Sequence, residues 1–454
     1  IIEASEEGRL GGRTGCINDD ALSARSKDKQ TMTRRKTLMV AAAAMLVPNL
    51  VLAQDAEFAS LADTQFIFNT LLFLIGGFLV FWMAAGFAML EAGLVRSKNV
   101  TTQLTKNIAL FGIAAIMYWL VGYNIMYPGD GNWLIQDVLG AFGTKDIKTD
   151  IDAGGYSNAS DFFFQLMFCA TTASIVSGTL AERVRLWPFI AFVALLTGVI
   201  YPIGASWQWG GGFLSQMGFS DFAGSTLVHV AGGFAALAGA IILGPRIGKY
   251  KDGRVIPMPG SNLALATLGT FILWMGWFGF NGASQLAMGT IEDADAIAQI
   301  FANTNMAAAA GAIAAMIMTQ LLYKKVDLTM VLNGALAGLV SITAGPLDPT
   351  LFGALWIGAG GGVIVVFAIP FLDKLKIDDV VGAIPVHLLA GLWGTLAVPF
   401  YTDGTSFGTQ FIGFAAVGGF VFVVSFIAFT ILKGAVGLRV SLQPQTHGRA
   451  TLGL

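Results

Sequence analysis

The chain has 454 residues, of which 55% are hydrophobic and only 12% are charged, about half of the ~25% charged share of a typical soluble domain. So few charges cannot cover the surface of a soluble protein of this size. The formal net charge of −2 does not suggest a nucleic-acid partner. The two cysteines allow no disulfide framework and no CxxC metal motif.

The N-terminal residues are predicted to be removed. Residues 1–31 are polar and aperiodic, and we interpret them as an extension before the native start at residue 32. Residues 32–53 have a basic segment from Arg34, an apolar stretch broken by Pro48 and a small-residue end, which is typical of a signal peptide cleaved before Gln54. A first transmembrane anchor is the alternative, but the apolar stretch is short and no stop-transfer flank follows it.

Residues 54–433 are predicted to form one membrane domain, followed by a short cytoplasmic tail over 434–454. A membrane-spanning helix needs about 20 apolar residues. We find about eleven such stretches, with centres near Gly76, Met117, Ala170, Leu195, Ala236, Leu273, Ala312, Ala337, Val363, Leu392 and Val423. The expected fold is therefore an all-α polytopic membrane protein, and the 57 glycines suit helices that pack closely in a bilayer.

Lysine and arginine alternate along the predicted loops. Of the 18 Lys and Arg residues after Gln54, 16 lie in odd-numbered loops or in the tail, whereas the even-numbered loops contain only Lys145 and Lys148. The first loop, for example, is expected to contain Lys106. Because cytoplasmic loops are enriched in Lys and Arg, we predict an N-terminus outside and a C-terminus in the cytoplasm, which agrees with a cleaved signal peptide.

Two histidines lie inside apolar stretches. His229 is in STLVHVAGGFAALAG, the fifth predicted span, and His387 is in GAIPVHLLAGLWG, the tenth. Both segments have the form V-H-φ-x-[AG]-G, where φ is apolar. Positions five and ten of eleven suggest two inverted five-helix repeats and a final helix, an arrangement that places functional residues near the middle of the membrane.

A charged group inside a membrane costs about 2.5–3.5 kcal/mol, so two matched histidines favour a functional role over a structural one. Two neutral imidazoles can share one proton in an N–H···N bond. Such a pair can line a narrow pore and pass a proton. A metal site is the competing hypothesis, but it lacks a third ligand at suitable spacing.

Aromatic and polar residues gather at the predicted outer ends of the spans. Among them are Trp209, Phe280 and Ser284, and Phe168 lies within the third span. Aromatic rings attract a desolvated cation by about 0.5–2 kcal/mol, although an interfacial aromatic belt has the same composition. Asp221 lies eight residues before His229, where it can support a cation, cap the fifth helix, or do both.

Six segments together resemble the ammonium transporter (Amt/Mep/Rh) family in its bacterial Amt form. They are GFAMLEAGLVRSKNV (86–100), SGTLAERVR (177–185), WQWGGGFL (207–214), DFAGSTLVHVAGG (221–233), GWFGFNGAS (276–284) and DDVVGAIPVHLLAGLWG (378–394). They follow the family's order through nearly the whole predicted mature chain. Glu91 occupies a position at which family members vary, and no role is expected for it.

The resemblance implies a homotrimer in the cell inner (plasma) membrane, with one narrow pore in each subunit and no cofactor. It implies a stacked gate of Phe168 and Phe280, an outer recruitment site of Phe168, Trp209 and Ser284 supported by Asp221, and His229 and His387 as paired pore histidines. It also implies that the basic inner loops dock a PII-type signalling protein, although the acid-rich stretch usual in the family's tail is missing here.

We therefore expect an ammonium transporter that recruits NH4+ outside, deprotonates it and passes NH3, with a proton conducted separately and hydrated K+ rejected. An ammonium sensor of the same fold and an electroneutral Rh-like channel for NH3 or CO2 are the alternatives. The sequence leaves methylammonium open as a further substrate. An enzyme is not expected, because the chain has no nucleophile elbow, P-loop or metal-ligand set.

Overall fold

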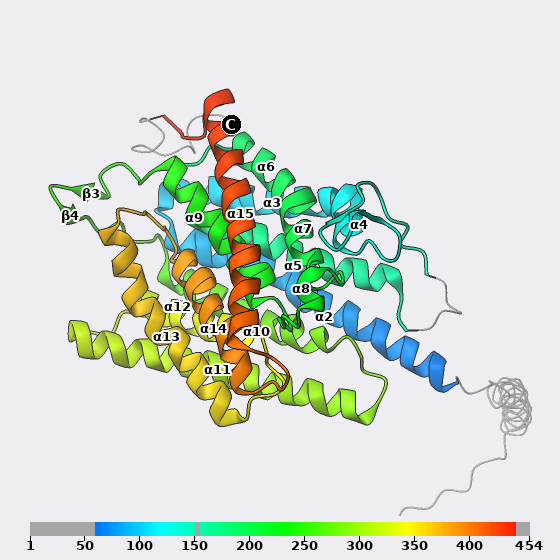
Figure 1. Ribbon diagram of the computed structural model, residues 1–454. Coiled ribbons are helices and arrows are strands. Elements are labelled where there is room, and N and C mark those ends of the chain that lie inside the picture. The colour runs from blue at the N-terminus through cyan, green and yellow to red at the C-terminus, as the bar shows by residue number, and fades with distance from the viewer. Residues whose placement is uncertain (1–59, 150–154, 442–454) are drawn as a thin grey trace, which may run out of the picture. The chain divides into compact units, whose positions relative to one another are not determined.

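The computed structural model describes residues 60–149 and 155–441, and residues from Leu61 onward form one compact unit. Helices make up most of this unit, and two of the longer connections between them contain short hairpins (Figure 1). The expected extension (1–31), the expected signal peptide (32–53) and the tail beyond residue 441 lie outside the described residues.

The elements are bounded as follows. The α-helices are α2 (Leu61–Leu94), α3 (Val100–Met117), α4 (Tyr123–Met126), α5 (Asn158–Thr179), α6 (Leu186–Leu195), α7 (Tyr201–Ser206), α8 (Phe213–Gln216), α9 (Ala231–Leu243), α10 (Leu263–Gly282), α11 (Ile291–Tyr323), α12 (Leu328–Ile342), α13 (Leu351–Lys374), α14 (Ala390–Ala397) and α15 (Phe407–Ala435). Four π-helical segments continue or precede them, namely η2 (Tyr118–Gly122), η4 (Leu196–Ile200), η5 (Ser225–Val230) and η7 (Ile384–Leu389). The 3-10 turns are η1 (Ser97–Asn99), η6 (Ala283–Gln285) and η8 (Val398–Phe400).

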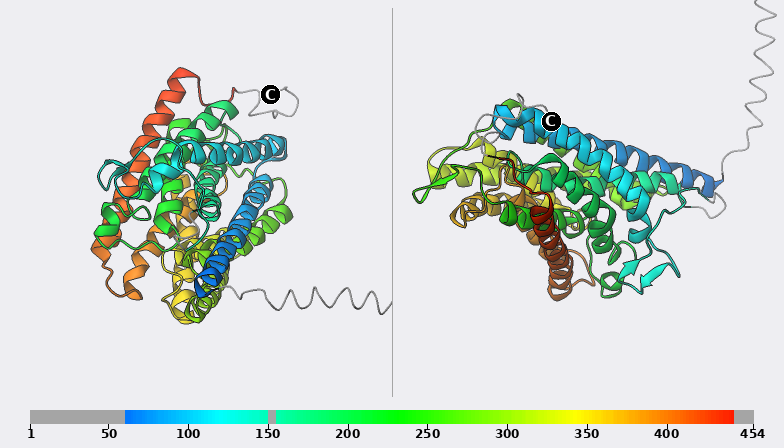
Figure 2. Two further views of the ribbon diagram at one scale, coloured as in Figure 1. Left: turned by 90° about the vertical axis from the view of Figure 1, so that its right-hand side faces the viewer. Right: turned by 90° about the horizontal axis from the view of Figure 1, so that it is seen from above.

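Two short antiparallel hairpins interrupt the helices. In the first, β1 (Trp133–Ile135) pairs with β2 (Leu139–Gly140), and Trp133 lies opposite Gly140. In the second, β3 (Tyr250–Lys251) pairs with β4 (Arg254–Val255). The two hairpins lie toward opposite ends of the helices (Figure 2), as expected of loops that carry even and odd numbers in the predicted topology.

The helices account for the apolar stretches of the sequence. Within the described residues, nine helices are long and apolar enough to cross a membrane. The eighth and tenth predicted stretches coincide with two shorter apolar helices, Leu328–Ile342 and Ile384–Phe400. All eleven predicted centres fall within these eleven segments, which confirms an all-helical polytopic membrane protein.

Glycine lets the helices approach one another closely. A Cβ atom at Gly269 of α10 would collide with the backbone nitrogen of Leu90 in α2, and one at Gly362 of α13 would collide with the carbonyl of Gly311 in α11. Helices in a bilayer gain stability chiefly from such van der Waals contact, because lipid is as apolar as their side chains. The last helix, α15, packs along α9 on one side of the molecule (Figure 1).

One predicted loop residue lies inside a helix. Lys106 belongs to α3 and is only 3% exposed, and its Nζ atom donates a hydrogen bond of 2.7 Å to the carbonyl of Ser177. The assignment of Lys106 to an inner loop is therefore wrong. An isolated charge suggests a helix end in sequence, but here a polar neighbour on α5 satisfies it within the helix packing.

Candidate functional site

The two histidines lie on π-helical segments that begin in the same way. His229 is on η5 and His387 is on η7. Each lies eight residues after an aspartate, Asp221 or Asp379, and five residues after a left-handed glycine. The φ angles of these glycines, Gly224 and Gly382, are 101° and 82°, a conformation that glycine adopts without steric cost.

Each aspartate caps its segment. The Asp221 carboxylate accepts hydrogen bonds from the backbone N–H groups of Thr226 and Leu227, both at 2.8 Å. Asp379 accepts from the N–H of Ile384 at 2.7 Å and from the hydroxyl of Thr179 at 3.0 Å. The helix-cap interpretation of Asp221 is confirmed. Asp379 was missed by the sequence analysis, although the repeated pattern D-x-x-G-x-x-x-x-H identifies it.

The imidazoles of His229 and His387 contact each other directly. Their Nδ1 atoms are 3.2 Å apart, and their ring centroids are 5.1 Å apart with 23° between the planes. His229 is fully buried and His387 is 4% exposed. Because a neutral imidazole has one N–H, a hydrogen bond between two Nδ1 atoms requires one ring to donate and the other to carry its proton on Nε2.

The rings of two phenylalanines extend this pair into a continuous row. Phe168 and Phe280 have ring centroids 4.1 Å apart, and Phe280 stacks on His229 at 5.3 Å. Trp277 flanks the same imidazole at 5.1 Å. Both phenylalanines are at most 1% exposed. The structure therefore brings together all four residues expected in the gate and the histidine pair.

A cavity of about 600 Å³ opens on the far side of Phe168. We call it the outer cavity, after the predicted orientation. Phe168, Trp209, Asp221 and Ser284 all line it, so the four residues of the expected recruitment site share one space. The Trp209 indole donates a 3.0 Å hydrogen bond to the backbone carbonyl of Asp221 and meets the Phe168 ring edge-on at 5.9 Å.

Ser284 presents an acceptor atom to the outer cavity, and Asp221 lines the same cavity. The Ser284 hydroxyl donates its proton to the carbonyl of Phe280 at 2.8 Å, which leaves its oxygen lone pairs for another donor. Burial raises the pKa of Asp221 to about 6, although the backbone N–H groups of its own cap oppose that rise. The carboxylate is therefore mainly ionised at neutral pH.

The outer cavity also contains polar residues that the sequence analysis missed. Asp161 of α5 accepts a 2.6 Å hydrogen bond from the Tyr123 hydroxyl, and Tyr127 and Tyr156 line the same wall. The buried Oε1 atom of Gln208 has no hydrogen-bond partner among the described residues. An acid within the apolar segment NASDFFFQLMF was the available signal for Asp161.

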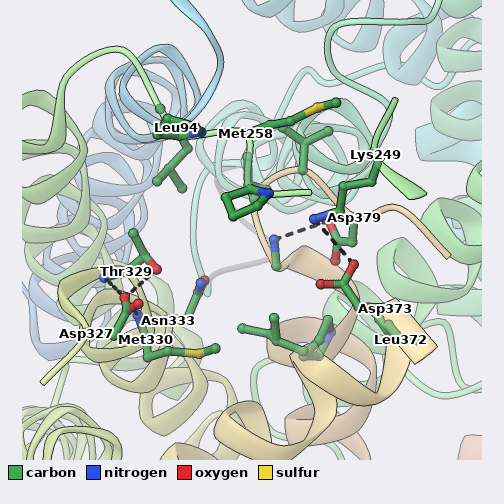
Figure 3. A pocket seen from close by; sticks show the side chains of 18 of the residues that line it. Leu94, Lys249, Met258, Asp327, Thr329, Met330, Asn333, Leu372, Asp373 and Asp379 are labelled. Carbon is green, nitrogen blue, oxygen red and sulfur yellow. Dashed lines mark hydrogen bonds and ion pairs between the residues drawn. The ribbon is translucent and has the colours of Figure 1, made fainter. Parts of the chain in front are cut away.

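A second cavity, of about 380 Å³, lies toward the opposite end and is called the inner cavity. Lys249, Asp373 and Asp379 lie on one side of it, facing Asp327 (Figure 3). A passage of only about 10 Å³, lined by His387 and eleven other residues, shares Asn333 and Val381 with this cavity. The histidine pair therefore lies between the two cavities.

An ion-pair network joins the loops near the inner cavity. Arg246 pairs with Asp378 at 2.9 Å and with Glu182 at 3.2 Å, and Glu182 also pairs with Arg96. Burial alone would raise the pKa of Asp378, but the hydrogen bonds and charge of Arg246, with the charge of Arg183, lower it to about 2. Several of the basic residues expected to face a docking partner are thus engaged within the molecule.

The described residues contain no group of three or more His, Cys, Asp or Glu side chains that could hold a metal ion. The histidine pair is flanked instead by aromatic rings, which supply no further ligand. The geometry suits an uncharged passage with a cation-attracting cavity at one end.

Comparison with known proteins identifies the family of this chain. A model described as the Ammonium Transporter Family matches residues 71–451. The ammonium transporter Amt2 of Archaeoglobus fulgidus is 41% identical over 406 residues, which cover 83% of this chain and 84% of that protein. A solved structure titled Sensor Amt Protein superposes with a TM-score of 0.79 at 35% identity, covering 85% of this chain and 98% of that one. The structure of Candida albicans Mep2 superposes with a TM-score of 0.75 at 25% identity, covering 85% and 89%.

The chain therefore belongs to the ammonium transporter family. It is a multi-pass membrane transporter and not an enzyme.

Proposed function

We propose that this chain moves ammonium across the membrane by deprotonating NH4+ at the outer cavity and passing NH3 along the histidine pair. The observation that carries the proposal is the unbroken row from Trp209 through Phe168, Phe280 and His229 to His387. A site that would attract a cation thus adjoins a row of aromatic and imidazole rings that ends at His387.

Recruitment depends on the aromatic faces of Phe168 and Trp209, the free lone pairs of Ser284 and the ionised carboxylate of Asp221. Aromatic faces attract a cation by about 0.5–2 kcal/mol, more when it is desolvated. Asp221 is held by its own helix N-terminus, so it adds negative potential without needing to contact the cation.

Deprotonation follows from the closed row of rings. The stacked Phe168 and Phe280 offer NH4+ no replacement for its hydration shell, and a bare charge in an apolar medium is strongly disfavoured. NH3 carries no charge and can follow the imidazoles as a hydrogen-bonding partner. The shared proton between the two Nδ1 atoms provides a separate route for H+, which makes the transport electrogenic.

We also propose eleven spans with the N-terminus outside, two inverted repeats and a homotrimer. The duplicated Asp-Gly-His pattern supports the repeats, because Asp221 lines the outer cavity and Asp379 the inner one. Docking of a PII-type protein would then use the inner-face lysines that remain exposed, including Lys251, Lys324 and Lys325.

The test is a current measurement on purified protein in proteoliposomes. An ammonium pulse should give a current and K+ should give none. Replacing the pair by His229→Asp with His387→Glu should admit K+, because two carboxylates can replace part of its hydration shell. An equal K+ current in the wild type, or unchanged selectivity in the double variant, would contradict the mechanism.

A sensor role is the second candidate, because the solved neighbour at 35% identity is titled a sensor. A sensor needs ammonium binding and a conformational response, whereas a transporter needs flux. Growth of a transporter-deficient strain on low ammonium separates the two, and only a transporter restores it. A Rh-like electroneutral channel would restore growth but give no current.

A further inference from the structure

Glu91 is a buried carboxylate on the wall of the narrow passage below the histidines. It lies in the last turn of α2 and is 1% exposed. The same passage is lined by His387 on one side and by Asn333, which also borders the inner cavity. Glu91 therefore lies between the histidine pair and the inner cavity, at which Figure 3 shows Asn333.

The two oxygens of Glu91 have different surroundings. Oε2 accepts hydrogen bonds from the Ser177 hydroxyl at 2.9 Å and from the Gln103 side-chain amide. Oε1 is buried and has no hydrogen-bond partner in the described structure. One oxygen is thus anchored by two donors, and the other retains its full capacity to accept.

Neighbouring groups hold this carboxylate in place. Gln103 also donates to the Ser177 hydroxyl at 3.1 Å, which fixes both donors relative to each other. Lys106 donates to the Ser177 carbonyl at 2.7 Å and supplies a positive charge behind the carboxylate. Burial disfavours the ionised state of an acid, and an opposite charge nearby works against that effect.

The space beside Oε1 is kept open by a glycine. A Cβ atom at Gly178 would lie 3.1 Å from Oε1 of Glu91 and 2.6 Å from a methyl group of Val381. Gly178 and Val381 both line the passage. An unpaired buried acceptor costs about 1–3 kcal/mol if nothing satisfies it, so the free oxygen and the space beside it point to a ligand that donates hydrogen bonds.

We propose that Glu91 forms a second ammonium-binding site, on the inner side of the histidine pair. Its Oε1 atom accepts an N–H bond from ammonia that has passed His387. When that NH3 takes up the proton arriving by the separate route, the carboxylate balances the charge of the resulting NH4+ before it enters the inner cavity. The site rests on the proposed function and extends it, since it assigns the point at which ammonium re-forms.

The titratable groups around this site are few. Among the residues lining the passage, the titratable ones are Glu91 and His387 on η7. Lys106 on α3 is close by, because it donates to the carbonyl of Ser177. The residues of α5 and α12 in the passage, such as Ser174, Gly178 and Leu336, do not titrate. A change in the pH profile of transport on altering Glu91 would therefore report on this short chain of groups.

The test compares Glu91→Gln with the wild type in proteoliposomes, measuring ammonium current against pH. We expect the current to fall about tenfold, the loss typical of one hydrogen bond to a charged group, with a changed pH profile. Ser177→Ala removes an anchor of Oε2 but keeps the carboxylate, so it should lower thermal stability while keeping the wild-type pH profile. Asp373→Asn neutralises an acid at the inner cavity outside the passage and controls for loss of negative charge.

Infrared difference spectra give a readout that does not depend on flux. Adding ammonium, but not K+, to the wild type should shift a carboxylate band that is absent in Glu91→Gln. Wild-type current and pH profile in Glu91→Gln would overturn the proposal, as would the same altered profile in Ser177→Ala, which would make Glu91 a structural tie. If Glu91→Gln does not fold, Glu91→Asp is the second test variant. Its shorter side chain withdraws the carboxylate from the passage, so we expect the same loss of current. Full current in Glu91→Asp would overturn the proposed site.

Failure of the wild type to carry ammonium current would instead refute the proposed function. A failure of the Glu91 proposal would leave wild-type transport intact, so the two failures are distinguishable.

Discussion

At the scale of single residues, function depends on polar atoms that have been buried with defined partners. The Nδ1 atoms of His229 and His387 form a hydrogen bond with each other. The Asp221 carboxylate accepts hydrogen bonds from the N-terminus of its own helix. A buried polar group without such a partner would cost about 1–3 kcal/mol. The partners therefore explain how a charge-poor interior tolerates these side chains.

Transport should weaken as the outside pH falls through about 6. The pKa of Asp221 is raised to about 6 by burial, so the carboxylate is charged above that pH and neutral below it. Only the charged form attracts NH4+ to the outer cavity. Measured as apparent affinity for ammonium against outside pH, the wild type should lose affinity between about pH 7 and 5.

Asp221→Asn is the matched variant for this prediction. Asparagine is as good a helix N-cap as aspartate, so the fold of η5 should survive while the charge is lost. Its affinity should be low at every pH, with no change near pH 6. A pH dependence in the variant equal to that of the wild type would assign the titration to another group.

At the scale of the elements, the histidine segments depend on glycine and on an ion-pair network. Gly382 lies two residues before η7 and has a left-handed φ of 82°. Asp378 holds the preceding loop through hydrogen bonds with Arg246 and Arg183. The position of His387 thus depends on a turn and on charged side chains in the loop before it.

Gly382→Ala should destabilise the protein by about 1–2 kcal/mol, the cost of a Cβ atom in the left-handed region. The added atom would also lie 2.8 Å from the Asn333 amide nitrogen. Thermal unfolding in detergent measures the effect. Gly419→Ala in α15 is the control, because its Cβ atom would meet nothing within 4 Å and alanine is the better helix former.

Stability should fall at low pH through Asp378. Its pKa is about 2 in the folded state, against 3.8 for the unperturbed group. A lowered folded pKa contributes stability that is complete above about pH 4 and is lost as the pH falls toward 2. Linkage puts this contribution at about 2 kcal/mol, so the melting temperature should drop in that window.

Asp378→Asn should already have the lower melting temperature at neutral pH and should lose less on acidification. An acid-induced drop as large in this variant as in the wild type would show that other carboxylates govern the low-pH transition.

At the scale of the whole molecule, the segment after the last helix ties distant parts of the chain together. The backbone N–H of Arg185 donates to the Leu438 carbonyl at 2.7 Å, and that of Val440 donates to the Arg183 carbonyl at 3.0 Å. Arg439 donates to the carbonyl of Leu243 at the end of α9. The segment that follows the final helix therefore contacts the loops at the ends of α5 and α9, which belong to the first predicted repeat.

Truncation after Ala435 should lower the melting temperature, because it removes all of these hydrogen bonds. Truncation after Ser441 keeps every contact described here for this segment and serves as the control. Ammonium current measured on both truncated proteins would show whether the hydrogen bonds of residues 436–441 also affect transport. Equal melting temperatures for the two truncations would contradict a stabilising role for residues 436–441.

Hydropathy, loop charge and short motifs are local properties of the chain, so the sequence alone predicts the helical membrane fold, the family and the pairing of His229 with His387. The sequence also identified four residues that line the outer cavity, namely Phe168, Trp209, Asp221 and Ser284, but not Asp161. The tertiary structure decided which polar atoms meet. The sequence predicts Lys106 in a loop and indicates no role for Glu91, because their common partner Ser177 lies more than seventy residues away in the chain. Only the packing of α2, α3 and α5 brings the three together, and only that packing leaves one oxygen of Glu91 free on the pore wall.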